Sequence, residues 1–387
     1  MLLHLARQPG EVDSCQQQGS STSSAAASRK EIGPCYPRLS EGRATRGLKR
    51  FARLLLAAST LPPGWLIHSI TGTTPLWAQQ GMIRLFSASR GVANDLMSRF
   101  LSLRYPPKPL DRRAGVLAAC SSEEIIRAAD IMRERGYFVL PRRVPPETCE
   151  RLLQFALTQP ALVRPRESHD GKSIAAVYDP ARPLGAYYRF EPRDVINHPD
   201  VQALMAEPLL IELAQAYLGA EPVADFIRMW WYSASAHPES AQLYHCDMSR
   251  IKWVRFFIYL TEVGPGNGPH CFVTGSHRTG GIPSRFLERG YAHVSDEEIS
   301  RSFKLEDIVE FFGPRGTIIA EDTRGLHKGQ QVHVGHRLIL QIQFSNSLFG
   351  HLYPRTTFES LKDPGLIEMS QRHPRVYSAF LPPSRGR

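Results

Sequence analysis

The stretch Trp253–Val263, WVRFFIYLTEV, is the part of this sequence that decides the fold. It is rich in aromatic and β-branched residues, which favour extended strands. Further runs of this kind follow Gly219 and are separated by Gly, Pro, Asn and Ser. The expected strands are Phe226–Ser233, Gln242–Asp247, Trp253–Val263, His270–Val273, Thr317–Ala320 and Leu338–Ser345. Many short strands in succession indicate a β-sandwich or a barrel.

Helical patterns come before these strands. Ser121 and Glu124 form a capping box, and Gly136 stands at the expected C-terminal cap, so a helix of about fourteen residues is predicted between them. It is followed by an expected strand at 137–140, a helix opened by Pro145 and Pro146, and two helices between Pro199 and Gly219 that Pro208 separates. The predicted class is therefore mainly β with flanking helices (α+β), a sandwich or barrel buttressed by N-terminal helices.

Composition limits the function. The 387 residues are 42% hydrophobic and 22% charged, as in a globular chain. The net charge of +10 lies in residues 1–113, with sixteen Lys and Arg against six Asp and Glu, whereas residues 114–387 hold thirty-one of each. A neutral body argues against nucleic-acid binding. No apolar run approaches the ~20 residues that cross a bilayer, so no integral membrane segment is expected.

The predicted domain division follows this charge boundary. Residues 1–113 are expected to be a basic extension, largely disordered or weakly helical, and residues 114–387 one domain with a barrel core at about 220–348. Deletion through Arg104 is then expected to leave stability and activity nearly intact. In the alternative, Met82–Arg104 packs as a helix on the barrel and protects four side chains, Leu85, Phe86, Leu96 and Phe100.

The cysteines and the N-terminus bear on location. Six cysteines without a CxxC pair favour a reducing compartment. The first residues lack the ordered regions of a secretory signal. A cytoplasmic protein is expected, with a processed N-terminal targeting segment as the alternative.

Two histidines and one aspartate carry the predicted chemistry. His245 and Asp247 are two residues apart, so on a strand both project from one face. This pair alone is weak evidence, because a surface strand can also hold it. His327 stands at a later loop-to-strand junction. Two His and one carboxylate are the ligand set of non-haem Fe(II) oxygenases.

Arg337 begins the alternating strand that follows His327. A buried arginine offers a planar fork that matches a carboxylate, as a dicarboxylate co-substrate requires. In the alternative, Arg337 is a strand-end residue that reaches water. Four other histidines compete for the third ligand position and are expected to be structural or exposed: His270, His277, His333 and His336.

The stretch 253–263 and the following NGPHCFVTGSHR, residues 267–278, resemble the core of the phytanoyl-CoA dioxygenase-like family. The similarity runs from about Gly136 through Ser345. It implies a double-stranded β-helix, a jelly-roll or cupin-like barrel, which couples 2-oxoglutarate decarboxylation at Fe(II) to substrate oxidation by O2. It also implies functions for the four residues: His245, Asp247 and His327 as catalytic iron ligands, and Arg337 as the holder of the remote carboxylate of 2-oxoglutarate. Thr274 stands where the family usually shows Pro.

The predicted activity is hydroxylation of a small organic substrate, with release of succinate and CO2. Asp247 fills the position that the family's halogenases leave open for chloride, so halogenation is disfavoured. The neutral body does not favour a CoA ester. Trp230, Trp231 and Tyr232 are either pocket or core residues, and Thr279–Arg315 is long enough for a lid. A catalytically silent relative and a cupin-like metal-binding protein are the alternatives; substrate identity and oligomeric state stay open.

Overall fold

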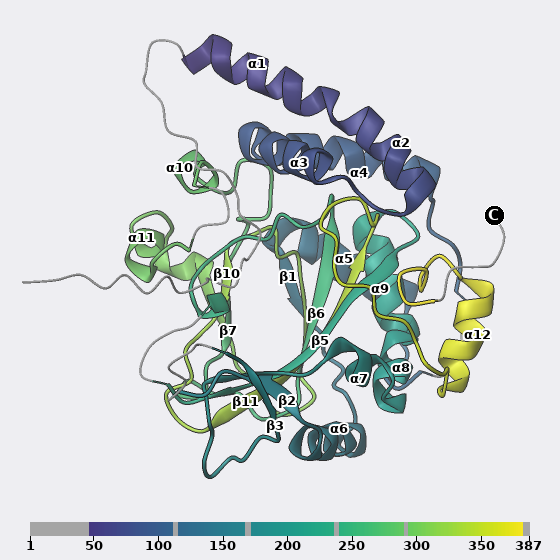
Figure 1. Cartoon of the computed structure of the whole chain (residues 1–387), viewed down its shortest axis with the longest axis vertical. Coiled ribbons are helices and arrows are strands. Elements are labelled where there is room, and N and C mark those ends of the chain that lie inside the picture. The colour runs from purple at the N-terminus through teal and green to yellow at the C-terminus, as the bar shows by residue number, and fades with distance from the viewer. Residues whose placement is uncertain (1–45, 111–114, 167–171, 236–239, 290–292, 382–387) are drawn as a thin grey trace, which may run out of the picture. The chain divides into compact units, whose positions relative to one another are not determined.

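The computed structural model describes residues 46–110, 115–166, 172–235, 240–289 and 293–381 (Figure 1). All of them belong to one unit, Pro34–Arg387, whereas the other unit, Met1–Gly33, lies outside the described residues. Of the extension predicted for residues 1–113 to be largely disordered or weakly helical, residues 1–45 therefore lie outside the described part of the chain.

Helices flank a β-rich centre. They are α1 (Arg46–Ser59), α2 (Leu61–Thr71), α3 (Leu76–Ser89), α4 (Val92–Arg104), α5 (Ser122–Arg135), α6 (Pro146–Thr158), α7 (Pro192–Ile196), α8 (Pro199–Met205), α9 (Pro208–Leu218), α10 (Ser284–Leu287), α11 (Asp296–Ser300) and α12 (Pro364–Arg372), with 3₁₀ turns η1 (Ser240–Gln242) and η2 (Leu305–Asp307). The predicted capping box at Ser121 with Glu124 is present, and a second capping box joins Ser295 and Glu298.

Two antiparallel sheets form the centre. The strands are β1 (Tyr137–Val139), β2 (Ala161–Val163), β3 (Ile174–Ala176), β4 (Tyr187–Arg189), β5 (Val223–Ser233), β6 (Trp253–Tyr259), β7 (His270–Val273), β8 (Ile308–Phe311), β9 (Ile318–Glu321), β10 (His327–Gly329) and β11 (His336–Ser345). The larger sheet has the order β1-β9-β6-β11-β5-β4-β2-β3, and the smaller has the order β10-β7-β8. Phe257 of the larger sheet and Phe272 of the smaller belong to one apolar cluster, so the two sheets face each other across an interior. The predicted fold class, a double-stranded β-helix with flanking helices, is confirmed.

The alternation of β6 and β11 explains which side chains reach that interior. Val254, Phe256 and Ile258 pack in the large cluster that the sheet shares with helices such as α5 and α9. Phe257 and Tyr259 instead pack in the cluster between the sheets. Because successive strand residues point to opposite faces, the odd-numbered residues of β6 lie on the inner face. The same period holds in β11, where 338, 340, 342 and 344 pack toward the helices and 339 packs inward.

The strand predicted at 242–247 is not a regular strand in the structure. Gln242–Asp247 is not a continuous strand: η1 covers its start, and only isolated bridges join Tyr244 to Val294 and His245 to His327. The other expected strands are present, with ends that differ by a few residues. A regular strand needs a continuous run of hydrogen-bonded partner residues, and sequence pattern alone does not supply these partners.

The structure also differs from the low order expected before residue 114. Residues 46–104 form four consecutive helices, α1 to α4, along one side of the unit (Figure 1). Met82 of α3 and Leu101 of α4 lie in an apolar cluster with Ile251 and Phe349 of the body. Asn94 of α4 also donates a hydrogen bond to the carbonyl oxygen of Ile251 at 3.0 Å. These helices are packed on the body, and the domain boundary at 113/114 stays a prediction.

The alternative prediction, in which Met82–Arg104 packs as a helix on the barrel, agrees with the structure in part. Leu85 and Phe86 are buried, whereas Leu96 and Phe100 are exposed. The structure thus removes the reason to expect that deletion through Arg104 is harmless, because the deletion would uncover Ile251 and Phe349. Such a deletion is now expected to lower stability.

A matched pair of substitutions tests this packing. Met82→Ala is expected to lower the free energy of unfolding by roughly 2–5 kcal/mol, because it opens a cavity in a buried cluster. Leu103→Ala on α4 should change it by no more than about 0.5 kcal/mol, because Leu103 is 84% exposed. Denaturant unfolding measures both values. Equal, small effects would mean that α3 does not pack on the body in solution.

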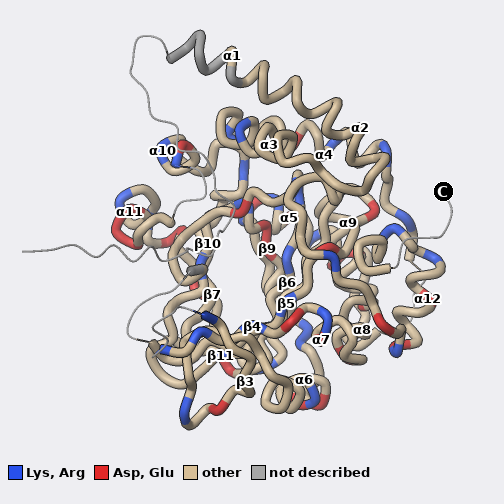
Figure 2. Tube along the Cα trace, in the orientation of Figure 1, with Lys and Arg blue, Asp and Glu red and all other residues tan. Residues whose placement is uncertain are grey.

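Lys and Arg are interspersed with Asp and Glu along the trace of the body (Figure 2). Within the described ranges, no helix combines the length and the apolar character that a bilayer crossing requires.

Candidate active site

Two backbone segments bring the predicted ligand residues together. The amide of His245 donates to the carbonyl oxygen of His327 at 3.0 Å, and the amide of His327 donates back at 2.9 Å. The amide of Asp247 donates to the carbonyl oxygen of Thr323 at 2.8 Å. This antiparallel pairing sets the His-x-Asp segment beside the loop that leads into β10. Residues about eighty positions apart in sequence thereby share one site.

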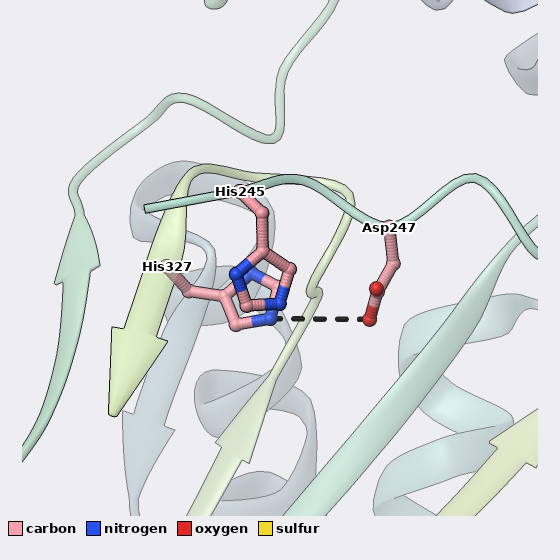
Figure 3. Close-up of side chains that lie close together, drawn as sticks. All are labelled: His245, Asp247 and His327. Atoms are coloured by element: carbon pink, nitrogen blue, oxygen red, sulfur yellow. Dashed lines mark ion pairs between the residues drawn. The ribbon is translucent and has the colours of Figure 1, made fainter. Parts of the chain in front are cut away.

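The three side chains converge on one point (Figure 3). One potential ligand atom from each of His245, Asp247 and His327 lies within 4.8 Å of the others. The two imidazole centroids are 4.3 Å apart, and Nε2 of His327 is 3.9 Å from Oδ2 of Asp247. Both histidines are buried. The arrangement offers two nitrogens and one oxygen to a single cation, as a facial 2-His-1-carboxylate site requires.

Hydrogen bonds orient both imidazoles. Nδ1 of His245 lies 2.8 Å from the carbonyl oxygen of Leu243, and Nδ1 of His327 lies 3.0 Å from that of Gly325. A carbonyl oxygen only accepts, so each Nδ1 carries the proton and each Nε2 carries the lone pair. Burial lowers the pKa of both rings, that of His327 to about 3, so both are neutral at physiological pH. Neutral imidazole is the form that binds a metal.

The carboxylate of Asp247 is held as an anion. Burial opposes ionisation, but the Arg255 guanidinium and the hydrogen bond from Thr323 keep the pKa of Asp247 well below its ordinary value. Nη1 of Arg255 donates to Oδ2 of Asp247 at 2.6 Å, and the hydroxyl of Thr323 donates to the same oxygen at 2.9 Å. One carboxylate oxygen is therefore committed to positioning the group, and Oδ1 receives neither bond.

Arg255 is a positioning residue that the sequence analysis missed. Its Nε and Nη2 donate to Oε1 of Gln343 at 2.9 and 2.6 Å, so its guanidinium is fixed while Nη1 holds Asp247. Arg255 is an odd-numbered, inward-facing residue of β6 and Gln343 of β11 lies opposite it. The signal in the sequence that could have identified Arg255 was its charge within the mostly apolar run Trp253–Val263.

Substitution of Arg255 should weaken metal binding. Arg255→Met removes both hydrogen bonds to Gln343 and the one to Asp247, and supporting contacts of this kind change metal affinity by roughly 10- to 100-fold. Fe(II) affinity measured by anaerobic titration should fall by that factor. Arg189→Met on β4, away from the cluster, is the matched control and should leave Fe(II) affinity unchanged. If Arg255→Met bound Fe(II) as tightly as the native chain, Arg255 would not be a positioning residue for the metal site.

Arg337 lies on the inner face of β11 and is 1% exposed. Its Nε and Nη1 have no hydrogen-bond partner among the described residues, and no carboxylate of the described chain forms an ion pair with it. Its guanidinium lies 5.2 Å from the ring centroid of Tyr232, directly opposite on β5. Gly329 leaves room for it, since a Cβ there would lie 2.7 Å from Nη2. A buried cation with unused donors requires an anion, so the chain fits the carboxylate of a co-substrate.

The competing histidines do not join the ligand cluster, although the ring centroid of His270 lies 5.7 Å from that of His327. His270 on β7 places Nε2 2.9 Å from Oε2 of Glu321, and its ring packs on Phe257. Burial raises the pKa of Glu321 and lowers that of His270, so both groups are neutral. Neither joins the cluster of metal-ligating groups found among the described residues. The sequence analysis missed this buried acid.

Each of the other three has a different environment. Nε2 of His277 lies 3.1 Å from the carbonyl oxygen of Arg133, which marks a structural contact. The ring of His336 packs edge-on against Trp231. His333 is exposed.

The aromatic residues before the His-x-Asp segment divide between two environments. Trp231 stacks on Tyr178 and donates to the carbonyl oxygen of Ala156 at 3.2 Å, so it belongs to the core behind the sheet. Trp230 packs with the cluster between the sheets, and Tyr232 lies beside Arg337. Only Trp230 and Tyr232 therefore face the side of the sheet on which the site lies.

A double-stranded β-helix with a buried His, Asp and His cluster is the architecture of non-haem Fe(II) oxygenases. A sequence profile of the phytanoyl-CoA dioxygenase (PhyH) family matches residues 132–333, just over half of the chain. The chain belongs to this family. It is an oxidoreductase, an Fe(II)- and 2-oxoglutarate-dependent oxygenase with O2 as co-substrate.

Several solved structures are similar to the chain. EctD from S. alaskensis with bound Fe is 21% identical, with a TM-score of 0.44 over 65% of this chain and 92% of that one. HygX from Streptomyces hygroscopicus with nickel and 2-oxoglutarate bound is 14% identical, with a TM-score of 0.40 over 61% and 91%. SnoK, a non-heme alpha ketoglutarate dependent carbocyclase from nogalamycin biosynthesis, is 16% identical, with a TM-score of 0.40 over 58% and 83%. The curated proteins include no significant match.

Proposed function

We propose that this oxygenase hydroxylates a small organic substrate and releases succinate and CO2. In this proposal His245, Asp247 and His327 hold Fe(II), which when bound supplies the redox chemistry that activates O2. Arg337 holds the remote carboxylate of 2-oxoglutarate. The domain that performs the reaction is proposed to span residues 114–387, with its barrel core at about 220–348.

The observation that supports this proposal best is the buried, unpaired guanidinium of Arg337. It lies on β11, which is hydrogen-bonded to β6, and β6 carries the Arg255 that holds Asp247. A cupin-like protein that only binds a metal has no use for a buried cation in this place, which costs free energy unless an anion joins it. A catalytically silent relative is disfavoured because all three ligand side chains are present and converge.

The residues of the chain supply orientation and charge. Nδ1 of each imidazole is fixed by a carbonyl oxygen, and Asp247 is fixed by Arg255. With one carboxylate, a divalent cation keeps one net positive charge, which favours chelation by the dianionic co-substrate. Asp247 occupies the position that chloride would need, so hydroxylation is proposed rather than halogenation. A neutral or amphipathic metabolite is the proposed substrate, with Trp230 and Tyr232 beside it.

The proposal also includes a covering role for one segment near the site and a location for the protein. Segment 279–315 carries α10, α11, η2 and β8, and Lys328 of β10 contacts Asp296 of this segment at 2.7 Å, which supports a covering role next to the site. A cytoplasmic location is proposed because the four described cysteines, Cys120, Cys149, Cys246 and Cys271, are free thiols.

The test is stoichiometry with product analysis. The purified chain is incubated with Fe(II), 2-oxoglutarate and O2 in the presence of metabolite extracts, and succinate is measured together with the mass of new products. Hydroxylation predicts one succinate for each product that gains one oxygen atom. Products that lose two hydrogens, or that gain chlorine, would show that the chain catalyses another oxidation and not hydroxylation. Absence of succinate above the metal-free control, with and without extract, would favour the silent or cupin-like alternative.

A further inference from the structure

A polar cavity lies outside the proposed iron site. It has a volume of about 530 Å³ and is bounded by α4, α5, α9 and the loops before β6, after β7 and after β9. Its lining includes five cations, Arg99, Arg133, Lys252, Arg278 and Arg324, and one acid, Asp95. None of the four proposed site residues lines it. We call it the cationic pocket.

Two of these cations are already paired. Arg324 donates to Asp322 at 2.8 Å and to Asp95 at 3.0 Å. Arg133 contacts Asp130 at 2.5 Å and donates to the carbonyl oxygen of Ala216. These ion pairs do not neutralise the other three cations of the lining.

Lys252, Arg278 and Arg99 have no side-chain hydrogen bond or ion pair within the described part of the chain. The ammonium of Lys252 lies 4.5 Å from the ring centroid of Tyr217, and this residue is half-buried, whereas Arg99 and Arg278 are exposed. Burial, followed by the nearby Arg324, lowers the pKa of Lys252 to about 8, so it is mostly protonated at pH 7. Unpaired cations in a partly buried concave site repel one another, and a bound anion relieves this repulsion.

The chemistry of the lining selects the anion. Guanidinium groups present planar pairs of donors and the ammonium a point charge, a combination that suits the oxygens of a phosphate group. Three hydroxyls also line the pocket: those of Ser102 and Thr279 already donate, to the carbonyl oxygen of Ser98 and to Asp95, so Ser98 is the one that keeps its proton for a ligand. The volume lies within the range of small-molecule sites and exceeds that of a phosphate ion, which leaves space for an organic part.

We propose that the cationic pocket binds a phosphate group, carried by a small phosphorylated molecule. Helix α4 supplies Asp95, Ser98, Arg99 and Ser102, so the N-terminal helices complete the site. The pocket is joined to the iron site by one short segment: Arg324 lines the pocket, and its neighbour Thr323 donates to Asp247. The proposal does not depend on the proposed function, because phosphate binding needs neither iron nor 2-oxoglutarate.

Calorimetric titration of the full chain with glycerol 3-phosphate, inorganic phosphate and acetate, at constant ionic strength, tests this proposal. Glycerol 3-phosphate is expected to bind with saturation and more tightly than acetate. Tighter binding of glycerol 3-phosphate than of inorganic phosphate supports a phosphorylated molecule as the occupant; equal or weaker binding supports free phosphate in the same oxyanion site. Absence of saturable phosphate binding, or tighter binding of acetate, overturns the proposal.

Variants locate the binding. Lys252→Met and Arg278→Gln are each expected to raise the Kd for glycerol 3-phosphate at least tenfold. Arg278 is exposed, so Arg278→Gln keeps the test valid if Lys252→Met fails to fold. Arg182→Gln, an exposed cation far from the lining, is the matched control and should leave the Kd unchanged. Equal Kd values in wild type and Arg278→Gln would place the bound phosphate elsewhere, for instance at Arg337, and so refute the assignment.

Discussion

His327→Ala should abolish iron-dependent consumption of 2-oxoglutarate while the chain stays folded. The imidazole is one of three groups whose potential ligand atoms lie within 4.8 Å of one another. Loss of a supporting contact near a metal already costs roughly 10- to 100-fold in affinity or activity, so loss of a ligand should exceed about 100-fold. The backbone hydrogen bonds between His327 and His245 do not involve the side chain, so the pairing of the two segments should persist.

Three measurements make this test specific. Fe(II) binding is measured by anaerobic titration, turnover by succinate release, and folding by circular dichroism. His333→Ala is the matched control, because this histidine is exposed and lies outside the cluster. We expect native values for the control. A His327→Ala variant that binds Fe(II) and releases succinate at the native rate would show that another residue completes the site.

Local sequence predicted most of the strands after Gly219, including the alternating strand β11. The alternation Leu338, Leu340, Ile342 describes a surface buried against helices, which leaves the odd-numbered positions for the interior. Arg337 therefore faces inward for a reason that can be seen without coordinates. The helix after Ser121 was equally well defined, because its cap and its C-terminal Gly136 both occur in the sequence.

The N-terminal helices were harder to predict because their stability depends on distant partners. Ala78, Met82 and Phe86 recur every four residues, but the surrounding Ser, Arg and Gly content suggested a tail. Ala78 and Met82 pack with Ile251 and Phe349, which lie more than 150 positions away in sequence, and Phe86 packs in a separate cluster with the equally distant Tyr244. Tertiary packing of this kind overrides local composition.

Positioning residues escaped the sequence analysis for a similar reason. Arg255 stands in an apolar strand, and nothing in that strand indicates that its guanidinium bridges Asp247 and Gln343. Glu321 ends a short apolar strand and carries no local motif, although its burial beside His270 makes it a neutral acid. Such contacts arise from strand order, which brings β6 between β9 and β11.

The environment of Arg337 determines what its replacement should do. The side chain is enclosed by Gly329 of β10 and Tyr232 of β5, so its guanidinium is held in place without a carboxylate partner in the described chain. A planar fork in this position can give two parallel hydrogen bonds to one carboxylate, whereas lysine offers a single ammonium at a different reach. The iron ligands do not contact this guanidinium through any hydrogen bond.

Arg337→Lys is therefore expected to raise the KM for 2-oxoglutarate by about 10- to 100-fold, since a charge-assisted hydrogen bond contributes roughly 1.5–3 kcal/mol. Fe(II) affinity should stay at the native value, because the metal cluster is untouched. Arg250→Lys serves as the control: Arg250 is also buried but already pairs with Asp225 at 2.5 Å, so its replacement should not change this KM. Steady-state kinetics with varied 2-oxoglutarate measures both variants. A native KM in Arg337→Lys would place the carboxylate site at another residue, and an equal rise in both variants would reduce the effect to a general loss of packing.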